Sequence, residues 1–87
     1  MPEIKVRIAS PVGLHARPAS QFVKAAAEHT GTVSIARPGT DPVDARSMLS
    51  VLSLAIGHGE EVVIRADGEG AEAVLAELSE LVSTVDS

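Results

Sequence analysis

The chain of 87 residues has no cysteine, tryptophan or tyrosine, and Phe22 is its single phenylalanine. Without cysteine it has neither disulfides nor thiolate metal ligands or nucleophiles. With one aromatic ring it lacks the stacking platforms that bind single-stranded nucleic acid. No apolar run reaches membrane-spanning length, and the N-terminus, MPEIKVRIAS, lacks the uninterrupted apolar segment of a signal peptide. We therefore expect a cytoplasmic protein with an aliphatic core, no membrane insertion, and one domain over residues 1–87.

Positive charge is scarce at the C-terminal end. The formal net charge is −5, but residues 1–59 hold six Lys/Arg against four Asp/Glu, whereas residues 60–87 hold only Arg65 against eight acidic residues. This asymmetry is typical of a solvated acidic helix, and the alternative is a locally positive site in the first half. Because the chain is acidic overall and has no basic stripe, nucleic acid is not an expected partner.

Hydrophobic periodicity predicts seven elements. Apolar and charged residues alternate over 3–8, which predicts a strand, and Ala19, Phe22, Val23 and Ala26 share one face of a helix over about 16–29. Further along, the pattern predicts a strand at 32–35, a hairpin partner at 42–45, a short helix at 47–56, a strand at 61–66 and a long helix from 71 to the C-terminus. The order βαββαβα favours an α+β fold with an antiparallel-rich sheet and its helices on a single face.

The segment GLHARPAS places His15 where a loop leads into the first helix. Free backbone N–H groups at Ala16 and Arg17, together with the positive end of the helix dipole, favour binding of a phosphate or carboxylate. Arg17 adds a planar fork suited to phosphate oxygens. Both features disfavour the protonated imidazole, lower the pKa of His15 and keep the ring nucleophilic. The simpler interpretation is a surface histidine near a helix start, but the Gly-x-His-x-Arg-Pro grouping favours a phosphoryl acceptor.

The other histidines do not extend this site. His29 is expected at the end of the first helix and His58 in a glycine-flanked loop, so the three histidines have no metal-ligand spacing. Neither a Mg²⁺-binding carboxylate pair nor a glycine-rich phosphate loop is evident. We therefore expect no metal and no cofactor.

The predicted helix 47–56, SMLSVLSLAI, is apolar around most of its circumference. A small domain with one sheet layer cannot easily cover such a helix, so some of Met48, Leu49 and Leu52 should remain exposed as a docking surface. The alternative is that the first and third helices cover it. Ser47 is placed to be the N-cap, and a phosphoryl group on it would be tolerated at the helix end.

Three stretches, GLHARPA, SQFVKAA and RSMLSVLSLAIGHGEEVVI, closely resemble the HPr family, the histidine-containing phosphocarriers of the bacterial phosphoenolpyruvate-dependent sugar phosphotransferase system (PTS). The resemblance covers nearly the whole chain, including its length and element order. It implies an open-faced β-sandwich, a four-stranded antiparallel sheet covered on one face by three helices.

The resemblance also implies roles for particular residues. His15 would accept a phosphoryl group on Nδ1 from phosphorylated enzyme I and pass it to a histidine of a sugar-specific IIA domain, while Arg17 steadies the group. The protein would be a monomeric carrier, not an enzyme with turnover of its own. Ser47 matches a serine that a dedicated kinase phosphorylates in some Gram-positive bacteria. Partners would dock on the first two helices, through Ser20, Lys24, Met48, Leu49, Leu52 and Ser53.

The chain departs from the family pattern in places. Val12 replaces a small polar residue that relatives often carry, and Ala27 and Ser50 are uncharged where many relatives have lysine, so steering of acidic partners would rest on Arg17, Lys24 and Arg46. Three alternatives remain open: a nitrogen-regulatory branch of the family, a regulatory binding module switched at Ser47, and a metabolite-binding α+β domain. The last gives the His-Ala-Arg-Pro motif no purpose.

Overall fold

The computed structural model describes residues 2–9 and 16–83 of the chain. The predicted order of seven elements is confirmed, and the elements are β1 (Glu3–Arg7), α1 (Ala16–Ala27), β2 (Val33–Ala36), β3 (Val43–Asp44), α2 (Met48–Ser53), β4 (Glu61–Ala66) and α3 (Ala71–Ser83).

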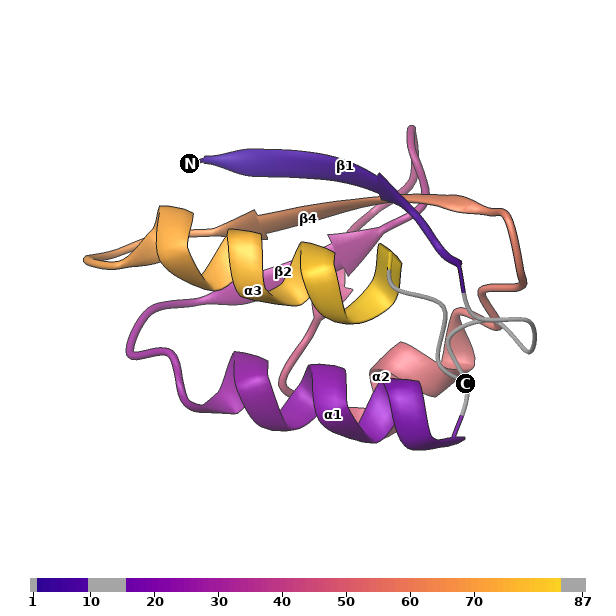
Figure 1. Ribbon diagram of the computed structural model, residues 1–87, viewed down its shortest axis with the longest axis horizontal. Coiled ribbons are helices and arrows are strands. Elements are labelled where there is room, and N and C mark those ends of the chain that lie inside the picture. The colour runs from indigo at the N-terminus through magenta and orange to yellow at the C-terminus, as the bar shows by residue number, and fades with distance from the viewer. Residues whose placement is uncertain (1, 10–15, 84–87) are drawn as a thin grey trace.

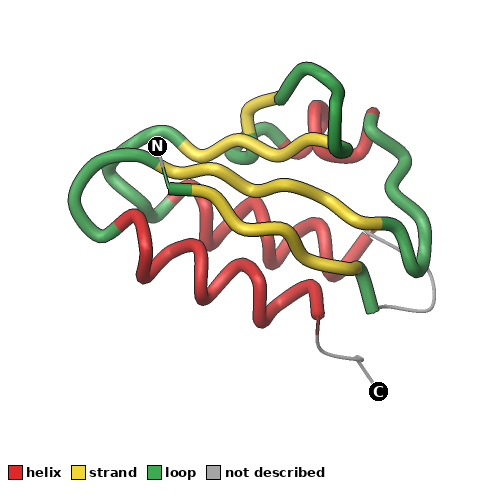
Figure 2. Tube along the Cα trace, turned by 90° about the horizontal axis from the view of Figure 1, so that it is seen from above, coloured by secondary structure: helices red, strands yellow, loops and turns green. Residues whose placement is uncertain are grey.

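The four strands form one antiparallel sheet in the order β1-β4-β2-β3. Since β4 lies between β1 and β2, the chain crosses from β1 through α1 to a strand that is not its neighbour. Figure 1 shows α1, α2 and α3 on one side of the sheet, and Figure 2, seen from above, shows the strands with the helices beneath them. The expected open-faced β-sandwich is confirmed.

Strand alternation explains which face the helices cover. Ile4 pairs with Ile64, and Ile64 pairs with Ile35 on the other side, so one apolar row crosses three strands. The neighbouring row, Glu3 with Arg65, lies on the opposite face, because successive side chains of a strand point to opposite sides. The helices close the apolar face, and the fully buried side chains that result include Phe22, Val33, Ile35, Val51, Val62, Ile64 and Leu78.

The helices are shorter than the periodicity predicts. α1 ends at Ala27 and α2 at Ser53, before the predicted ends at residues 29 and 56. Ala55 adopts a positive φ of 52°, which a helix cannot contain, so the chain leaves the helical path before Ile56. The predicted continuation of the third helix over 84–87 lies outside the described residues.

A hydrogen-bonded junction closes the end of the molecule where α1 leads into β2. The Thr32 backbone N–H and hydroxyl both donate to Oδ1 of Asp67, at 2.6 and 2.8 Å, and these bonds hold the pKa of Asp67 below its usual 3.8. The His29 ring donates from Nε2 to the Asp67 carbonyl at 2.7 Å. At Gly31 a Cβ atom would stand 2.1 Å from that same carbonyl oxygen, so only glycine fits. His29 therefore has a structural partner at this junction.

Candidate functional site at the start of the first helix

The predicted phosphoryl acceptor, His15, lies outside the described residues, and α1 begins at the next residue, Ala16. The first turn contains no acidic side chain, and Arg17 in it is exposed. The first N–H groups of any helix lack intrahelical partners. The predicted helix start is confirmed, and binding of a phosphoryl group by the backbone of Ala16 and Arg17 stays a prediction.

One face of α1 is open to solvent. Arg17, Ser20 and Lys24 are exposed and follow one another at helical spacing, while Phe22 and Ala26 on the other face are fully buried. The helix therefore presents two cations and a hydroxyl on the surface that continues from its first turn.

The second helix adds an apolar side chain to this surface. Leu49 is 81% exposed and is the one large exposed hydrophobic residue among residues 2–9 and 16–83. Met48 and Leu52 are half-buried and pack against the core, and Val51 is fully buried. Ser53 is exposed and donates its hydroxyl to the Ser50 carbonyl at 2.6 Å. The expectation of an exposed apolar residue on this helix is therefore confirmed for Leu49.

The two helices are in contact with each other (Figure 1). We use the name α1–α2 surface for the residues that these helices contribute to the predicted docking area: Ser20, Lys24, Met48, Leu49, Leu52 and Ser53. Whether partners bind there stays a prediction.

Ser47 is the N-cap of α2, as the sequence predicts. It has extended backbone angles, φ −103° and ψ 112°, and its Oγ accepts the backbone N–H of Ser50 at 3.2 Å. The hydroxyl is half-buried at the edge of the α1–α2 surface. Its role as a phosphorylation site stays a prediction.

Only part of the expected positive charge is free. Arg17 and Lys24 form no ion pair with any carboxylate of the described residues. Arg46, the third cation expected to steer acidic partners, instead pairs with Asp44 at 3.2 Å. Its backbone N–H also donates to Asp44, and these bonds lower the pKa of that carboxyl group. Within the part of the chain that the structure describes, the unpaired positive charge near the site therefore comes from α1.

A clamp at the end of α2 is formed by Arg37, for which the sequence pattern predicts no role. Arg37 Nη1 donates to the Leu54 carbonyl at 2.6 Å and Nη2 to the Ala55 carbonyl at 3.2 Å. Its Nε donates to Glu60 Oε1 at 2.9 Å, and Glu60 also accepts the Gly57 N–H, so the pKa of Glu60 is lowered, chiefly by Arg37. No local pattern encodes these contacts, because the acceptors lie 17 to 23 residues away from Arg37 in the sequence.

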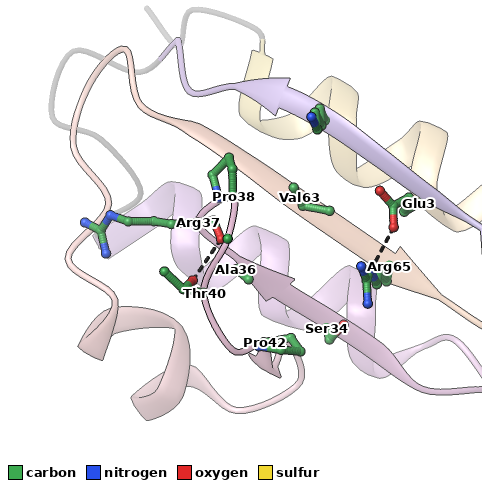
Figure 3. Close-up of a pocket in the computed structure, with 11 residues that line it drawn as sticks. Glu3, Ser34, Ala36, Arg37, Pro38, Thr40, Pro42, Val63 and Arg65 are labelled. Atoms are coloured by element: carbon green, nitrogen blue, oxygen red, sulfur yellow. Dashed lines mark hydrogen bonds and ion pairs between the residues drawn. The ribbon is translucent and has the colours of Figure 1, made fainter.

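The open face of the sheet carries a separate shallow hollow of about 200 Å³. Figure 3 shows Ala36 and Val63 on its floor, Pro38 and Thr40 from the β2–β3 turn, and the Glu3–Arg65 ion pair of 2.9 Å at the other side. This hollow lies on the side of the sheet opposite the helices, so it is not part of the predicted site.

In the described part of the chain, no group of three or more His, Cys, Asp or Glu side chains could hold a metal ion. Every helix among those same residues is too short or too polar to cross a bilayer.

The fold and the surface together define a class of protein: a small open-faced β-sandwich whose candidate reactive group directly precedes a helix with one face open to solvent. Within this class, the family model for the PTS HPr component phosphorylation site matches residues 2–84, and the chain belongs to this family of phosphocarrier proteins.

Known relatives agree along nearly their whole length. The phosphocarrier protein HPr of Streptomyces coelicolor is 49% identical over 83 residues, which is 95% of this chain and 89% of the relative. The crystal structure of HPr from Bacillus anthracis matches with a TM-score of 0.87 at 34% identity, covering 93% of this chain and 95% of that one. Crh of Bacillus subtilis, described as a domain-swapped dimer, matches with a TM-score of 0.71 at 36% identity, covering 94% and 93%.

Proposed function

We propose that the chain accepts a phosphoryl group on Nδ1 of His15 from phosphorylated enzyme I and passes it to a histidine of a sugar-specific IIA domain. Membership of the HPr family supports a PTS phosphocarrier, and the acceptor atom and the two partners are our proposal. The observation that carries the proposal is the first turn of α1, which directly follows His15 and presents Arg17 exposed and unpaired among the described residues.

The chemistry is an exchange between two nitrogen atoms. The lone pair of the neutral His15 ring attacks phosphorus, one N–P bond forms as the donor's N–P bond breaks, and the donor imidazole leaves. Because the broken and formed bonds are alike, the carrier needs access and charge complementarity more than catalytic groups of its own. Arg17 and the N–H groups of Ala16 and Arg17 would bind the phosphoryl oxygens. The chain would then be a protein substrate of the relay and not an enzyme.

Docking would use the α1–α2 surface. Leu49 offers an apolar contact that a partner can cover, and Lys24 offers, on the neighbouring helix, a cation with no carboxylate partner among the described residues. A central apolar anchor surrounded by polar groups is the usual composition of a protein–protein interface.

The test is phosphorylation of the purified protein by enzyme I and radiolabelled phosphoenolpyruvate. We expect one acid-labile phosphoryl group per chain, absent in His15→Ala and retained in His58→Ala, which removes an exposed histidine elsewhere as the matched control. Arg17→Ala should slow transfer while leaving the unfolding transition in place. Label on His15→Ala would disprove the assignment, and an unaltered rate for Arg17→Ala would remove that residue from the mechanism.

Ser47 carries a second proposal, regulation by a serine kinase. The hydroxyl caps α2 beside Met48 and Leu49, and phosphorylation would add about −1.5 to −2 charge there, which disfavours an acidic partner. Ser47→Asp should therefore reduce transfer from enzyme I. Ser47→Ala should transfer normally and lose only about 1 kcal/mol of stability with the cap. Equal transfer rates for the two variants would count against a regulatory role.

We further propose that residues 1–87 act as one domain, monomeric and cytoplasmic, in sugar uptake. Light scattering at several protein concentrations tests the monomer against a dimer of the kind described for Crh. Neighbouring genes for sugar permeases or enzyme I would favour uptake, whereas a nitrogen sigma-factor operon would favour the regulatory branch.

A further inference from the structure

We propose that Arg37 is a positioning residue for the α1–α2 surface: it fixes the C-terminal end of α2 and thereby the orientation in which α2 presents Leu49 to a partner. The inference rests on the proposed phosphocarrier function, in which enzyme I and the IIA domain dock on that surface.

The first argument is the length of α2. The helix has six residues, and the carbonyl groups at the C-terminal end of a helix that no later backbone N–H reaches need hydrogen-bond donors from elsewhere. Ser47 satisfies a donor at the start of the helix. At the other end, Arg37 donates to the carbonyl of Leu54, the C-cap, and to that of Ala55, just beyond the helix. A cation at this end is also favoured by the helix dipole.

The second argument is that Glu60 joins the same guanidinium to the loop that follows the helix. The carboxylate accepts from Nε and Nη2 of Arg37 at 2.9 and 3.3 Å and from the Gly57 backbone N–H. The Glu60 carbonyl in turn accepts the Ile8 N–H at 2.9 Å, and Gly59 N–H donates to the Ile8 carbonyl at 2.9 Å. Arg37 thus connects the β2–β3 turn, the end of α2, and the loop that pairs with the chain just beyond β1.

The third argument is what else holds α2. Val51 is fully buried, Met48 and Leu52 pack against the core, and Ile56, beyond the end of the helix, is buried, so α2 is anchored on its inner side while Leu49 faces solvent. Without Arg37, nothing among the described side chains would hold the Leu54 and Ala55 carbonyls, and the outer side of the helix could tilt about its buried anchors. Figure 3 shows that Arg37 lines the edge of the hollow, with its guanidinium group pointing away from Arg65.

Arg65 supplies a matched control. Its ion pair with Glu3 has the same Nε–Oε1 distance of 2.9 Å as the Arg37–Glu60 pair, and the side-chain exposures are similar, 47% and 44% against 36% and 38%. Arg65 lies on the open face of the sheet, opposite the helices, and its side chain donates to Glu3. Arg65→Met therefore removes an equivalent ion pair without touching the end of the helix.

The first measurement is the rate of phosphoryl transfer from enzyme I as a function of carrier concentration, at a temperature at which every variant is folded. For Arg37→Met we expect the KM to rise about tenfold with kcat nearly unchanged, since a loss of about 1.4 kcal/mol in docking corresponds to that factor. Arg37→Lys keeps the charge but not the planar guanidinium group, so its KM should fall between those of the wild type and Arg37→Met. Arg65→Met should match the wild type. A KM for Arg37→Met no higher than that for Arg65→Met overturns the inference.

The second measurement needs no partner. In Arg37→Met, the Leu54 and Ala55 amides, which bond to the Val51 and Leu52 carbonyls, should exchange hydrogen about tenfold faster relative to the Val74 amide of α3. If the wild type took no phosphoryl group from enzyme I, the proposed function would fail, and exchange alone would then decide the positioning role. Unchanged relative exchange would overturn it in either case.

Discussion

Truncation of Leu49 to alanine should weaken docking and leave the fold intact. Leu49 is 81% exposed, so the core loses little when it is shortened. Complete burial of a leucine side chain contributes about 1.5–3 kcal/mol, so covering its exposed part in a complex would contribute about 1–2 kcal/mol. Loss of that contribution predicts a KM of enzyme I for the carrier raised about five- to thirtyfold.

The assay is the initial rate of phosphoryl transfer from enzyme I over a range of carrier concentrations, together with thermal unfolding. Leu49→Met keeps the apolar volume and should retain the wild-type KM. Leu49→Asp should bind enzyme I more weakly than Leu49→Ala and so have a higher KM. Stability of the alanine variant should stay within about 0.5 kcal/mol of wild type, as is usual for surface substitutions. An unchanged KM for Leu49→Ala refutes docking through this residue.

Three further predictions concern the framework. Ala55→Gly should raise the free energy of unfolding by up to about 1 kcal/mol, because an alanine with a left-handed backbone is strained and a glycine is not. The gain is limited because glycine also increases the entropy of the unfolded chain. A lower midpoint of chemical denaturation than in the wild type would contradict the strain. Gly31→Ala should destabilise by about 1–3 kcal/mol through its clash with the Asp67 carbonyl, whereas Gly57→Ala, facing only a carboxylate oxygen at 3.3 Å, should cost less. Because the folded pKa of Asp67 is lowered, its contribution to stability is present above the usual pKa of 3.8 and lost as pH falls below it. Asp67→Asn should flatten the pH dependence of the unfolding temperature between pH 5 and pH 3, measured against wild type, and an unaltered slope would count against this.

The parts of the fold that local patterns encode were predictable. The alternation around Ile4 and Val6 places apolar side chains on one face whatever their partners are, and the spacing of Ala19, Phe22 and Ala26 does the same for α1. N-caps are equally local, because Ser47 bonds to an N–H three residues away. These features depend on residues that are close in the sequence, so they can be predicted without knowledge of the tertiary structure.

The C-terminal ends of the first two helices were not predictable, because they depend on residues that are distant in the sequence. Periodicity continues through Leu54 and Ile56, yet α2 ends at Ser53 and Ala55 turns to a positive φ. The groups that satisfy this end come from Arg37, 17 and 18 residues earlier in the chain. At the junction between α1 and β2, the sequence places His29 only at the end of its own helix, whereas the acceptor of its ring N–H is the Asp67 carbonyl, 38 residues away.

Pairing of charges, more than their number, decides how the surface can attract a partner. Of the seven basic residues, Arg37, Arg46 and Arg65 are each tied to a carboxylate, which removes most of their field at a distance. The cations without such a partner among the described residues are Lys5 and Arg7 on β1 and Arg17 and Lys24 on α1. α3, which packs beside α1, exposes Glu72 and Glu77 and would repel an acidic partner. An acidic surface that approaches from the helical side is therefore attracted at α1 and repelled at α3. Because the charges are exposed, this difference weakens as added salt shortens the screening length to about 10 Å or less.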